Sequence, residues 1–363
     1  SRVLVVYGGQ SAVKSGLLDR VLSSLDQAGL PHSTLGGVHP NPRLSLAKAG
    51  VKQALAFGAD FLLAVGGGSV IDTAKAIADG AANPGVDLWD LWERKVPLTA
   101  SLPVGVVLTI PAAGSESSNA AVLTHDETKV KRGLGSDLQR PRFAILNPEL
   151  TASLPPYHMS CGVLDIMMHT MDLFFNPITT NNLTDEIAEG LLRSTICNGS
   201  LSLEHPGEYQ AMSELMWAGS LSHNGLTGLG GIIDFAPHQL GHELSAMFDV
   251  AHGASLAAIW DSWARYCYQT NSARFARFGV KVWGLASGKD DESLALEAIE
   301  TTAAYFRSLN MPTCLSTLGC GPLSEQTLQE LSHRCTFQGS RTIGSFRVLG
   351  YEDILAIYRL ANH

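Results

Sequence analysis

Apolar positions in the first part of the chain form short continuous runs, and segments of helical periodicity lie between them. The runs are rich in β-branched residues and too short for helices, so each predicts a strand buried on both faces. They are VLVVY (3–7), FLLAV (61–65), PVGVVLTI (103–110), AAVLTH (120–125) and FAILN (143–147). Apolar residues recur with helical spacing at 15–29, 43–58 and 70–82. This alternation predicts a parallel sheet with helices on both faces.

The pattern of apolar positions changes at about residues 150–156. Pro148, Pro155 and Pro156 lie in or directly before this segment and interrupt regular structure. Beyond this point β-branched runs are scarce and long helical patterns dominate, at 162–175, 184–203, 210–226 and 292–310. We therefore predict an α/β domain over residues 1–154 and an all-helical domain over residues 155–363.

Composition supports two globular domains and narrows the class of partner. A chain of 363 residues exceeds the size at which one core keeps growing, and 45% of its residues are hydrophobic. The net charge of -9, without a clustered basic face, argues against nucleic acid as a partner. No apolar stretch is long enough for a bilayer, and the six scattered cysteines form no C-x-x-C pair. We expect a cytoplasmic protein without a secretory signal or a membrane partner.

A glycine-rich turn joins a predicted strand to a predicted helix in FLLAVGGGSVIDTAK. Successive glycines let backbone N–H groups approach a phosphate, and the helix start favours an anion, so Gly67, Gly68 and Ser69 are candidate cofactor contacts. The pattern is neither G-x-G-x-x-G nor a P-loop, and a tight turn without a ligand is the alternative. Ser69 and Asp72 form S-x-x-D, which predicts a capping box at the helix start.

A second glycine turn follows the first predicted strand in VVYGGQS. Two-domain α/β dehydrogenases often carry a carboxylate here that binds the adenosine ribose. Gly8, Gly9 and Gln10 occupy this place instead, so no acid repels a 2′-phosphate. A plain loop is the alternative.

Asp165 and His169 are four residues apart and share one face of a predicted helix. Their neighbours are leucine, isoleucine and methionine, so the helix is predicted to be buried, and a buried carboxylate is costly unless it is paired or binds a metal. Asp172 lies one turn further along the same face, as an outer hydrogen-bond acceptor. The alternative is an internal Asp–His hydrogen bond.

Three histidines lie within HQLGHELSAMFDVAH: His238, His242 and His252. With Asp165 and His169 they make five candidate groups for the roughly four positions of a metal site, so one histidine is not a ligand. Spacing alone leaves open which one. Imidazole and carboxylate suit Fe(II) or Zn(II), which would polarise an alcohol or carbonyl oxygen, and the remaining histidine would transfer a proton.

Taken together, these segments resemble the iron-containing (group III) alcohol dehydrogenase family, and within it the NADP-dependent butanol dehydrogenase and aldehyde reductase branch. The matching landmarks occur in family order: GGVHPNP (36–42), GGGSVIDTAK (66–75), GSESSNAAVLT (114–124), GVLDIMMH (162–169) and HQLGHELSAMFDVAHG (238–253). The resemblance implies a dehydroquinate synthase-like fold, in which the first domain binds the dinucleotide and the helical domain holds the metal and the substrate.

The resemblance also implies roles for individual residues. It assigns the metal to Asp165, His169, His238 and His252, and proton relay to His242. Its cofactor contacts, together with the two glycine turns, make a set of eleven candidates: Gly8, Gly9, Gln10, Asn41, Gly67, Gly68, Ser69, Asp72, Thr109, Ser118 and Lys131. NAD-preferring members carry an Asp at the position of Gly9, so its absence favours NADP over NAD.

The expected function is therefore a metal-dependent and NADP-dependent oxidoreductase that interconverts alcohols and aldehydes, with Fe2+ as the metal and Zn2+ as the alternative. By family analogy we expect a homodimer. The first rival is a metal-dependent lyase or hydrolase acting on a phosphorylated substrate, and the second is a non-catalytic nucleotide-binding protein. Two departures stand out. The family's additional strand-containing N-terminal segment is missing, which suggests a truncation or a rearranged sheet edge, and PAAGSE (111–116) replaces the usual AGTGSE.

Overall fold

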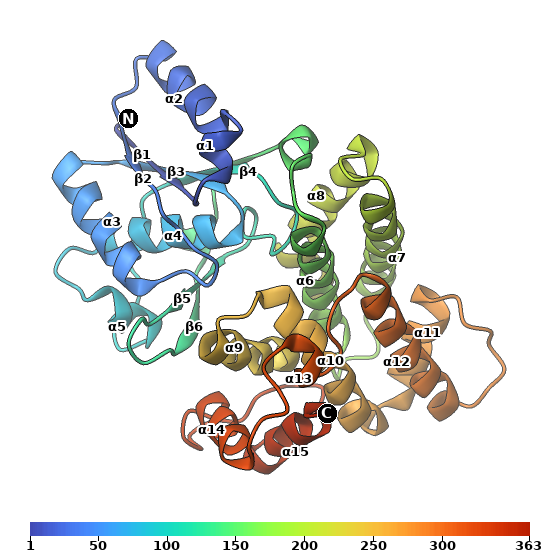
Figure 1. Ribbon diagram of the computed structural model, residues 1–363. Coiled ribbons are helices and arrows are strands. Elements are labelled where there is room, and N and C mark those ends of the chain that lie inside the picture. The colour runs from blue at the N-terminus through green and yellow to red at the C-terminus, as the bar shows by residue number, and fades with distance from the viewer. The chain divides into compact units, whose positions relative to one another are not determined.

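The computed structural model describes residues 1–363 (Figure 1). Its internal contacts divide the chain into two compact units, Ser1–Ser153 and Leu154–His363. The predicted boundary after residue 154 lies one residue beyond this division. Each unit is described by itself.

The first unit is built on a five-stranded sheet in which all neighbouring strands are parallel. The strand order is β2 (His32–Leu35), β1 (Val3–Tyr7), β3 (Phe61–Gly66), β4 (Val104–Leu108) and β7 (Phe143–Leu146). Strands β1, β3 and β4 are almost completely buried, as their continuous apolar runs predict. The predicted parallel sheet is confirmed.

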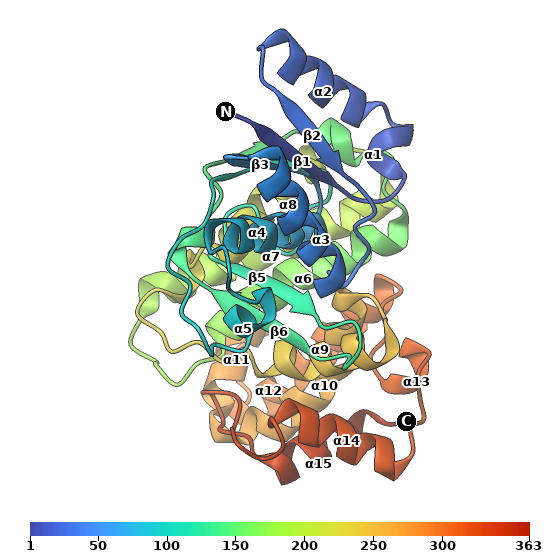
Figure 2. The same ribbon diagram turned by 90° about the vertical axis from the view of Figure 1, so that its left-hand side faces the viewer.

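Helices cover both faces of this sheet, as Figures 1 and 2 show. On one face, side chains of α2 pack against Val5, Leu63 and Val107. On the other face α4 contacts β3 and lies beside α3. The helices of the unit are α1 (Ser11–Lys14), α2 (Leu17–Gln27), α3 (Leu44–Phe57), α4 (Gly68–Ala82) and α5 (Leu88–Trp92), with short 3-10 turns at Asp137–Gln139 and Pro148–Thr151.

One predicted strand of the parallel sheet is not part of it. Strand β5 (Ala120–Thr124) pairs antiparallel with β6 (Lys131–Gly135) in a separate two-stranded sheet. The connection is short: the N–H of His125 donates to the carbonyl of Val130, whereas a parallel neighbour needs a long crossover. The sequence of β6, KRGLG, lacks β-branched residues and an apolar run, so the partner strand was missed.

The second unit is entirely helical, which confirms the predicted fold class. Helix α6 begins at Pro156 rather than at the predicted residue 162, because proline suits the first helical turn and apolar periodicity marks only the buried part. Short 3-10 turns lie at Leu226–Gly228 and Tyr268–Thr270. The helices are α6 (Pro156–Phe174), α7 (Asn182–Glu204), α8 (Tyr209–His223), α9 (Ala236–Phe248), α10 (His252–Cys267), α11 (Ser272–Val282), α12 (Asp291–Ser308), α13 (Leu315–Leu318), α14 (Glu325–Cys335) and α15 (Tyr351–Ala361).

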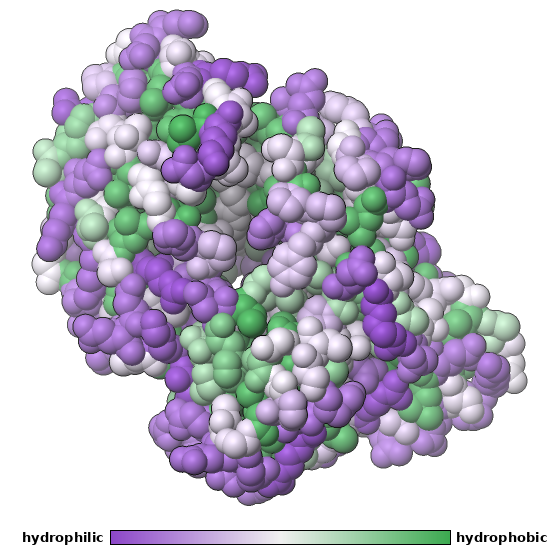
Figure 3. Space-filling view, viewed as in Figure 1, coloured by the Kyte–Doolittle hydropathy of each residue, from purple (hydrophilic) through white to green (hydrophobic).

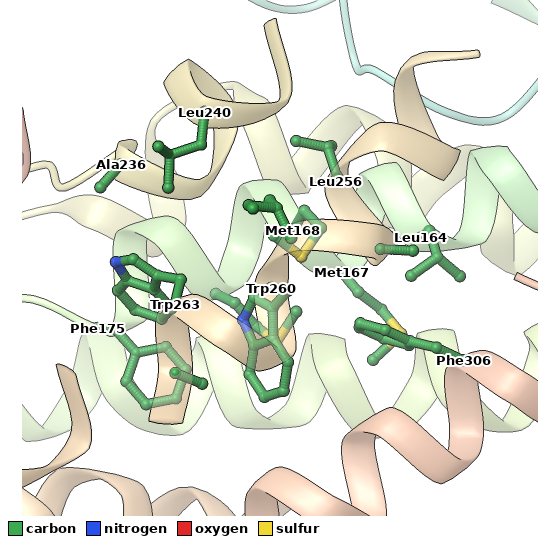
Figure 4. Close-up of a cluster of buried hydrophobic side chains, with 14 of the residues drawn as sticks. Leu164, Met167, Met168, Phe175, Ala236, Leu240, Leu256, Trp260, Trp263 and Phe306 are labelled. Carbon is green, nitrogen blue, oxygen red and sulfur yellow. The ribbon is translucent and has the colours of Figure 1, made fainter. Parts of the chain in front are cut away.

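Helix α6 runs through the middle of the core of this unit. Figure 4 shows Met167 and Met168 of α6 beside Leu256 and Trp260 of α10. All four side chains have no exposed surface. Any polar side chain on α6 therefore needs a partner inside the protein.

The face drawn in Figure 3 carries hydrophilic and hydrophobic residues side by side. No helix is long and apolar enough to span a membrane. Exposed large apolar side chains do occur in the segment before α9, at Leu229, Ile232 and Ile233.

Helices α6 and α10 approach each other closely at Gly253, directly after His252. A Cβ atom at Gly253 would lie 2.3 Å from the carbonyl oxygen of Cys161 and 2.8 Å from its Cα. Both obstacles are backbone atoms, which cannot rotate away. Glycine at this position therefore lets the first turn of α10 reach α6.

We expect Gly253→Ala to lower the free energy of unfolding by about 1–3 kcal/mol, because the added methyl group overpacks the contact between the two helices. Urea denaturation followed by circular dichroism measures the change. Gly190→Ala is the matched control, since a Cβ at that position of α7 meets only the end of the Arg193 side chain at 3.7 Å. The control should gain up to about 1 kcal/mol from helix propensity. Equal stability of Gly253→Ala and the wild type would contradict the prediction.

Candidate metal centre and cofactor-binding turns

Helix α6 presents Asp165 and His169 together inside the helical unit. Both residues are only 4% exposed. The His169 ring places Nδ1 2.9 Å from the backbone carbonyl oxygen of Asp165, so Nδ1 carries the hydrogen and Nε2 keeps a lone pair. Burial, reinforced by the nearby His238, holds the pKa of His169 well below its usual value. The ring is therefore neutral, the form that binds metals.

Helices α9 and α10 add His238 and His252 to the same cluster. Asp165 Oδ1 lies 3.6 Å from His238 Nε2 and 3.7 Å from His252 Nε2. The candidate ligand atoms of these three residues all lie within 4.8 Å of one another. His169 is not one of this trio but approaches it, with Nδ1 3.3 Å from Asp165 Oδ1. The structure thus brings the four predicted ligands into one cluster.

The chemistry of these atoms fits a divalent transition metal. Asp165 Oδ1 and His238 Nε2 are both buried and make no hydrogen bond, although the two atoms face each other 3.6 Å apart. Unpartnered polar atoms at such depth are costly, and a bound cation would remove the cost of both. A donor set of imidazole and carboxylate matches Fe(II) and Zn(II).

Asp172 fixes the orientation of the His238 ring through a hydrogen bond with Nδ1. Its Oδ2 accepts a hydrogen bond from His238 Nδ1 at 2.6 Å, which directs Nε2 toward Asp165. Burial lowers the pKa of His238, but the carboxylates of Asp172 and Asp165 outweigh burial and raise this pKa to about 9, so a metal that binds Nε2 would have to displace its proton. Carboxylate–histidine pairs of this kind are frequent behind metal ligands, where they fix the tautomer and the ring orientation.

Two further histidines stand beside the cluster. The ring of His242 lies 5.1 Å from that of His252 and 6.2 Å from that of His238, and His242 is outside the trio. His223, at the end of α8, stacks on His169 with ring centroids 4.0 Å apart. The sequence did not indicate His223 as a site residue, because it lies outside every matching motif and shares no helix with the other histidines of the cluster.

In the first unit, both glycine turns follow strands of the parallel sheet. Gly8, Gly9 and Gln10 come directly after β1. Gly67 precedes α4, and a Cβ there would lie 2.2 Å from the Ile110 side chain, so the close fit requires glycine. The predicted capping box is wrong: Gly67 is the N-cap, Ser69 already lies inside α4, and no side chain caps the helix.

The Asp72 side chain does not cap α4 but forms a hydrogen bond with strand β5 of the hairpin. Its Oδ2 accepts the N–H of Val122 at 3.0 Å. Next to it the fully buried Lys75 donates from Nζ to the carbonyl oxygens of Ser118 and Ala120, at 3.0 and 2.8 Å. Burial lowers the pKa of Lys75 to about 8, although the Asp72 carboxylate opposes this shift. Lys75 was missed because a lysine within an apolar helix has no distinctive spacing.

The remaining predicted cofactor residues lie around these elements. Lys131, on β6, donates from Nζ to Asn41 Oδ1 at 3.1 Å, and both residues are 5% exposed. Thr109 follows β4 and donates its N–H to the carbonyl of Gly66. Ser118 is fully buried, and its hydroxyl oxygen also accepts from Lys75. Cofactor contact by this set stays a prediction.

Comparison with known proteins covers both units. The family described as iron-containing alcohol dehydrogenase matches residues 1–148, and its C-terminal counterpart, the Fe-containing alcohol dehydrogenase family, matches residues 159–362. NADH-dependent butanol dehydrogenase A of Clostridium acetobutylicum is 38% identical over 99% of this chain and 92% of its own. NADPH-dependent aldehyde reductase YqhD of Escherichia coli is 37% identical over 88% of this chain and 82% of its own.

Solved structures show the same relationship. The crystal structure of NADH-dependent butanol dehydrogenase A from Thermotoga maritima superposes with a TM-score of 0.95 at 33% identity, covering 100% of this chain and 91% of the other. That of YqhD from E. coli gives 0.94 at 34% identity, covering 99% and 92%. Sequence and structure agree over both units. The chain therefore belongs to the iron-containing alcohol dehydrogenase family, in its butanol dehydrogenase and aldehyde reductase branch.

Proposed function

We propose that this protein is a metal-dependent, NADP-preferring oxidoreductase that interconverts alcohols and aldehydes. The observation that carries the proposal is the buried cluster in which Asp165 Oδ1 and His238 Nε2 face each other without a hydrogen bond. Family membership supports iron as the metal, with zinc as the alternative that metal analysis decides. Six free thiols favour a reducing compartment, the cytoplasm, and the homodimer is proposed by analogy alone.

The ligands in this proposal are Asp165, His169, His238 and His252. When bound, the metal acts as a Lewis acid that polarises the oxygen of the alcohol or aldehyde. Asp172 keeps Nε2 of His238 directed at Asp165 by holding its Nδ1–H. His252, with a side chain 24% exposed against 4% for His238, forms the open side of the cluster. His242 stands next to it and exchanges a proton with the substrate oxygen.

The first unit carries features that suit a dinucleotide. Helix α4 has no side-chain cap, so its first N–H groups are available to a phosphate, which the positive end of the helix also attracts. A side chain at Gly9 would enter open space, so the end of β1 has room for a ribose substituent. The two relatives compared above are named as NADH-dependent and NADPH-dependent, and the preference for NADP proposed for this chain therefore rests on Gly9.

We expect Gly9→Asp to shift the ratio of kcat/KM for NADPH over NADH by at least about tenfold toward NADH, which equals about 1.4 kcal/mol. The new carboxylate repels the 2′-phosphate and binds the ribose hydroxyls. Steady-state assays with both cofactors measure the ratio. Gly9→Asn is the matched control, with the same shape and no charge, and should change the ratio less. A wild type that already prefers NADH would overturn the proposed NADP preference.

We expect His252→Ala to weaken metal binding by more than about 100-fold, because loss of a ligand costs more than loss of an outer partner. Metal analysis of anaerobically purified protein measures the loss, and consumption of NADPH with butyraldehyde measures the activity. His333→Ala is the control, since this histidine packs against Tyr351 outside the cluster. Full metal content and full activity in His252→Ala would refute the ligand assignment. A wild type that consumes no NADPH with aldehydes would refute the proposed reaction.

We expect His242→Ala to keep its metal and to lower kcat by about 10²- to 10⁴-fold, the usual range for loss of a proton-transfer group. Comparing metal content and kcat in the same preparations separates this role from that of a ligand. Metal loss in His242→Ala equal to that in His252→Ala would show that His242 belongs to the ligand set.

A further inference from the structure

His223 is placed against a candidate metal ligand without belonging to the candidate ligand set. It is the last residue of α8 and lies outside every motif that carries the family resemblance. Its ring is nearly parallel to that of His169, with centroids 4.0 Å apart and planes inclined by 25°. This is the shortest centroid distance among the ring pairs of the histidine cluster, so the stack is close enough to influence how His169 is held.

Phe235 contacts the same group of rings from another segment. Its ring centroid lies 6.1 Å from that of His169 and 5.1 Å from that of His238, at inclinations of 67° and 65°. It also lies 6.2 Å from the ring of His223. Edge-to-face contacts of this kind are favourable and have a preferred direction. Together, His223 and Phe235 constrain the ring of His169 in two different ways.

The ring plane of His169 needs such a constraint. Its hydrogen bond from Nδ1 to the Asp165 carbonyl holds one atom, but the torsion that rotates an imidazole ring has broad minima. The lone pair of Nε2 lies in the ring plane. A tilt of the ring therefore moves the position at which Nε2 can bind a metal, and aromatic neighbours are what fixes this tilt.

The backbone at Phe235 supports a specific placement of its ring. Phe235 has φ = 54°, in the left-handed region that an aromatic residue rarely adopts. The preceding carboxylate of Asp234 holds this conformation: Oδ1 accepts the N–H of Ala236 at 2.8 Å, and Oδ2 accepts those of Ser345 and Phe346 at 2.8 and 2.7 Å. Strain that is held by three hydrogen bonds beside a functional cluster is typical of a positioned side chain.

We propose that His223 and Phe235 are positioning residues that set the ring plane of His169 for metal binding. The inference rests on the proposed metal site, but it concerns a different property, namely how tightly the metal is held. The flat rings of His223 and Phe235 are the groups that matter, and ligation by a nitrogen of His223 is not part of the mechanism.

The test compares His223→Ala with His223→Phe in metal-stripped protein. Binding of Co²⁺ is measured by competition with a chelating dye, and the visible absorption of the bound ion reports its ligand geometry. We expect His223→Ala to bind Co²⁺ about 10- to 100-fold more weakly with an altered spectrum, the range for loss of an outer partner. His223→Phe keeps a stacking ring and should stay closer to the wild type than to the alanine variant.

Two further variants keep the test decisive. Phe235→Leu removes the second flat ring with little change in volume, and we expect weaker Co²⁺ binding from it as well, which covers the case in which His223→Ala fails to fold. His333→Ala, which removes an imidazole stacked on Tyr351, should leave Co²⁺ affinity unchanged. Circular dichroism confirms folding of each variant.

The positioning role is overturned if His223→Phe binds Co²⁺ as weakly as His223→Ala, because the nitrogens would then matter, or if His223→Ala and Phe235→Leu bind like the wild type. The proposed function fails separately. A wild type that binds Co²⁺ with the expected variant pattern but reduces no aldehyde would retain the positioning role and lose the reaction.

Discussion

The buried carboxylate of Asp165 is the constraint on which the helical unit depends. A charged oxygen among the methionines and leucines of α6 costs several kcal/mol unless neighbouring groups compensate it. The imidazoles of His169, His238 and His252 compensate this charge. Only His169 is close to Asp165 in sequence, and the other two lie on α9 and α10. The fold must therefore bring α9 and α10 onto the same stretch of α6, and Gly253 allows that approach.

The junction between α9 and α10 shows how the two histidines fourteen residues apart come together. Helix α9 is flanked by Phe235 and Asp249, both with φ = 54°. These left-handed residues end the helix abruptly at each side, so His238 sits in its first turn and His252 opens the next helix. Asp172 and Asp234 supply the polar contacts that hold one side of this arrangement. The candidate metal centre thus combines the middle of α6 with the adjoining ends of α9 and α10, so side chains from different directions converge there.

Sequence patterns predicted the layers of both units, because continuous apolar runs and helical periodicity directly reflect burial. The patterns failed where burial is only partial: β6 buries only Lys131 and Leu134 and has no apolar run, and α6 extends beyond its apolar segment. At the site, spacing placed Asp165 with His169 on one helix face but left open which histidine is not a ligand, whereas the structure brings His238 and His252 into the trio with Asp165. Only the family resemblance assigned different roles to His242 and His252. The contacts of α6 with α9 and α10 join residues far apart in sequence, so local spacing does not reveal them.

The residues that no pattern revealed share one property: each supports residues of another element. Lys75 donates hydrogen bonds to the backbone carbonyl oxygens of Ser118 and Ala120, at the start of the β5–β6 hairpin. His223 stacks on the ring of His169. Neither needs a fixed spacing from its partner, because the partner lies on another element and the contact depends on the packing of both. A metal-binding motif or a glycine turn needs particular residue types nearby in the sequence. A residue that supports a ligand needs only a partner nearby in the folded structure. The supporting contacts of such a site can therefore be identified only after the fold is known, and they decide how rigidly its ligands are held.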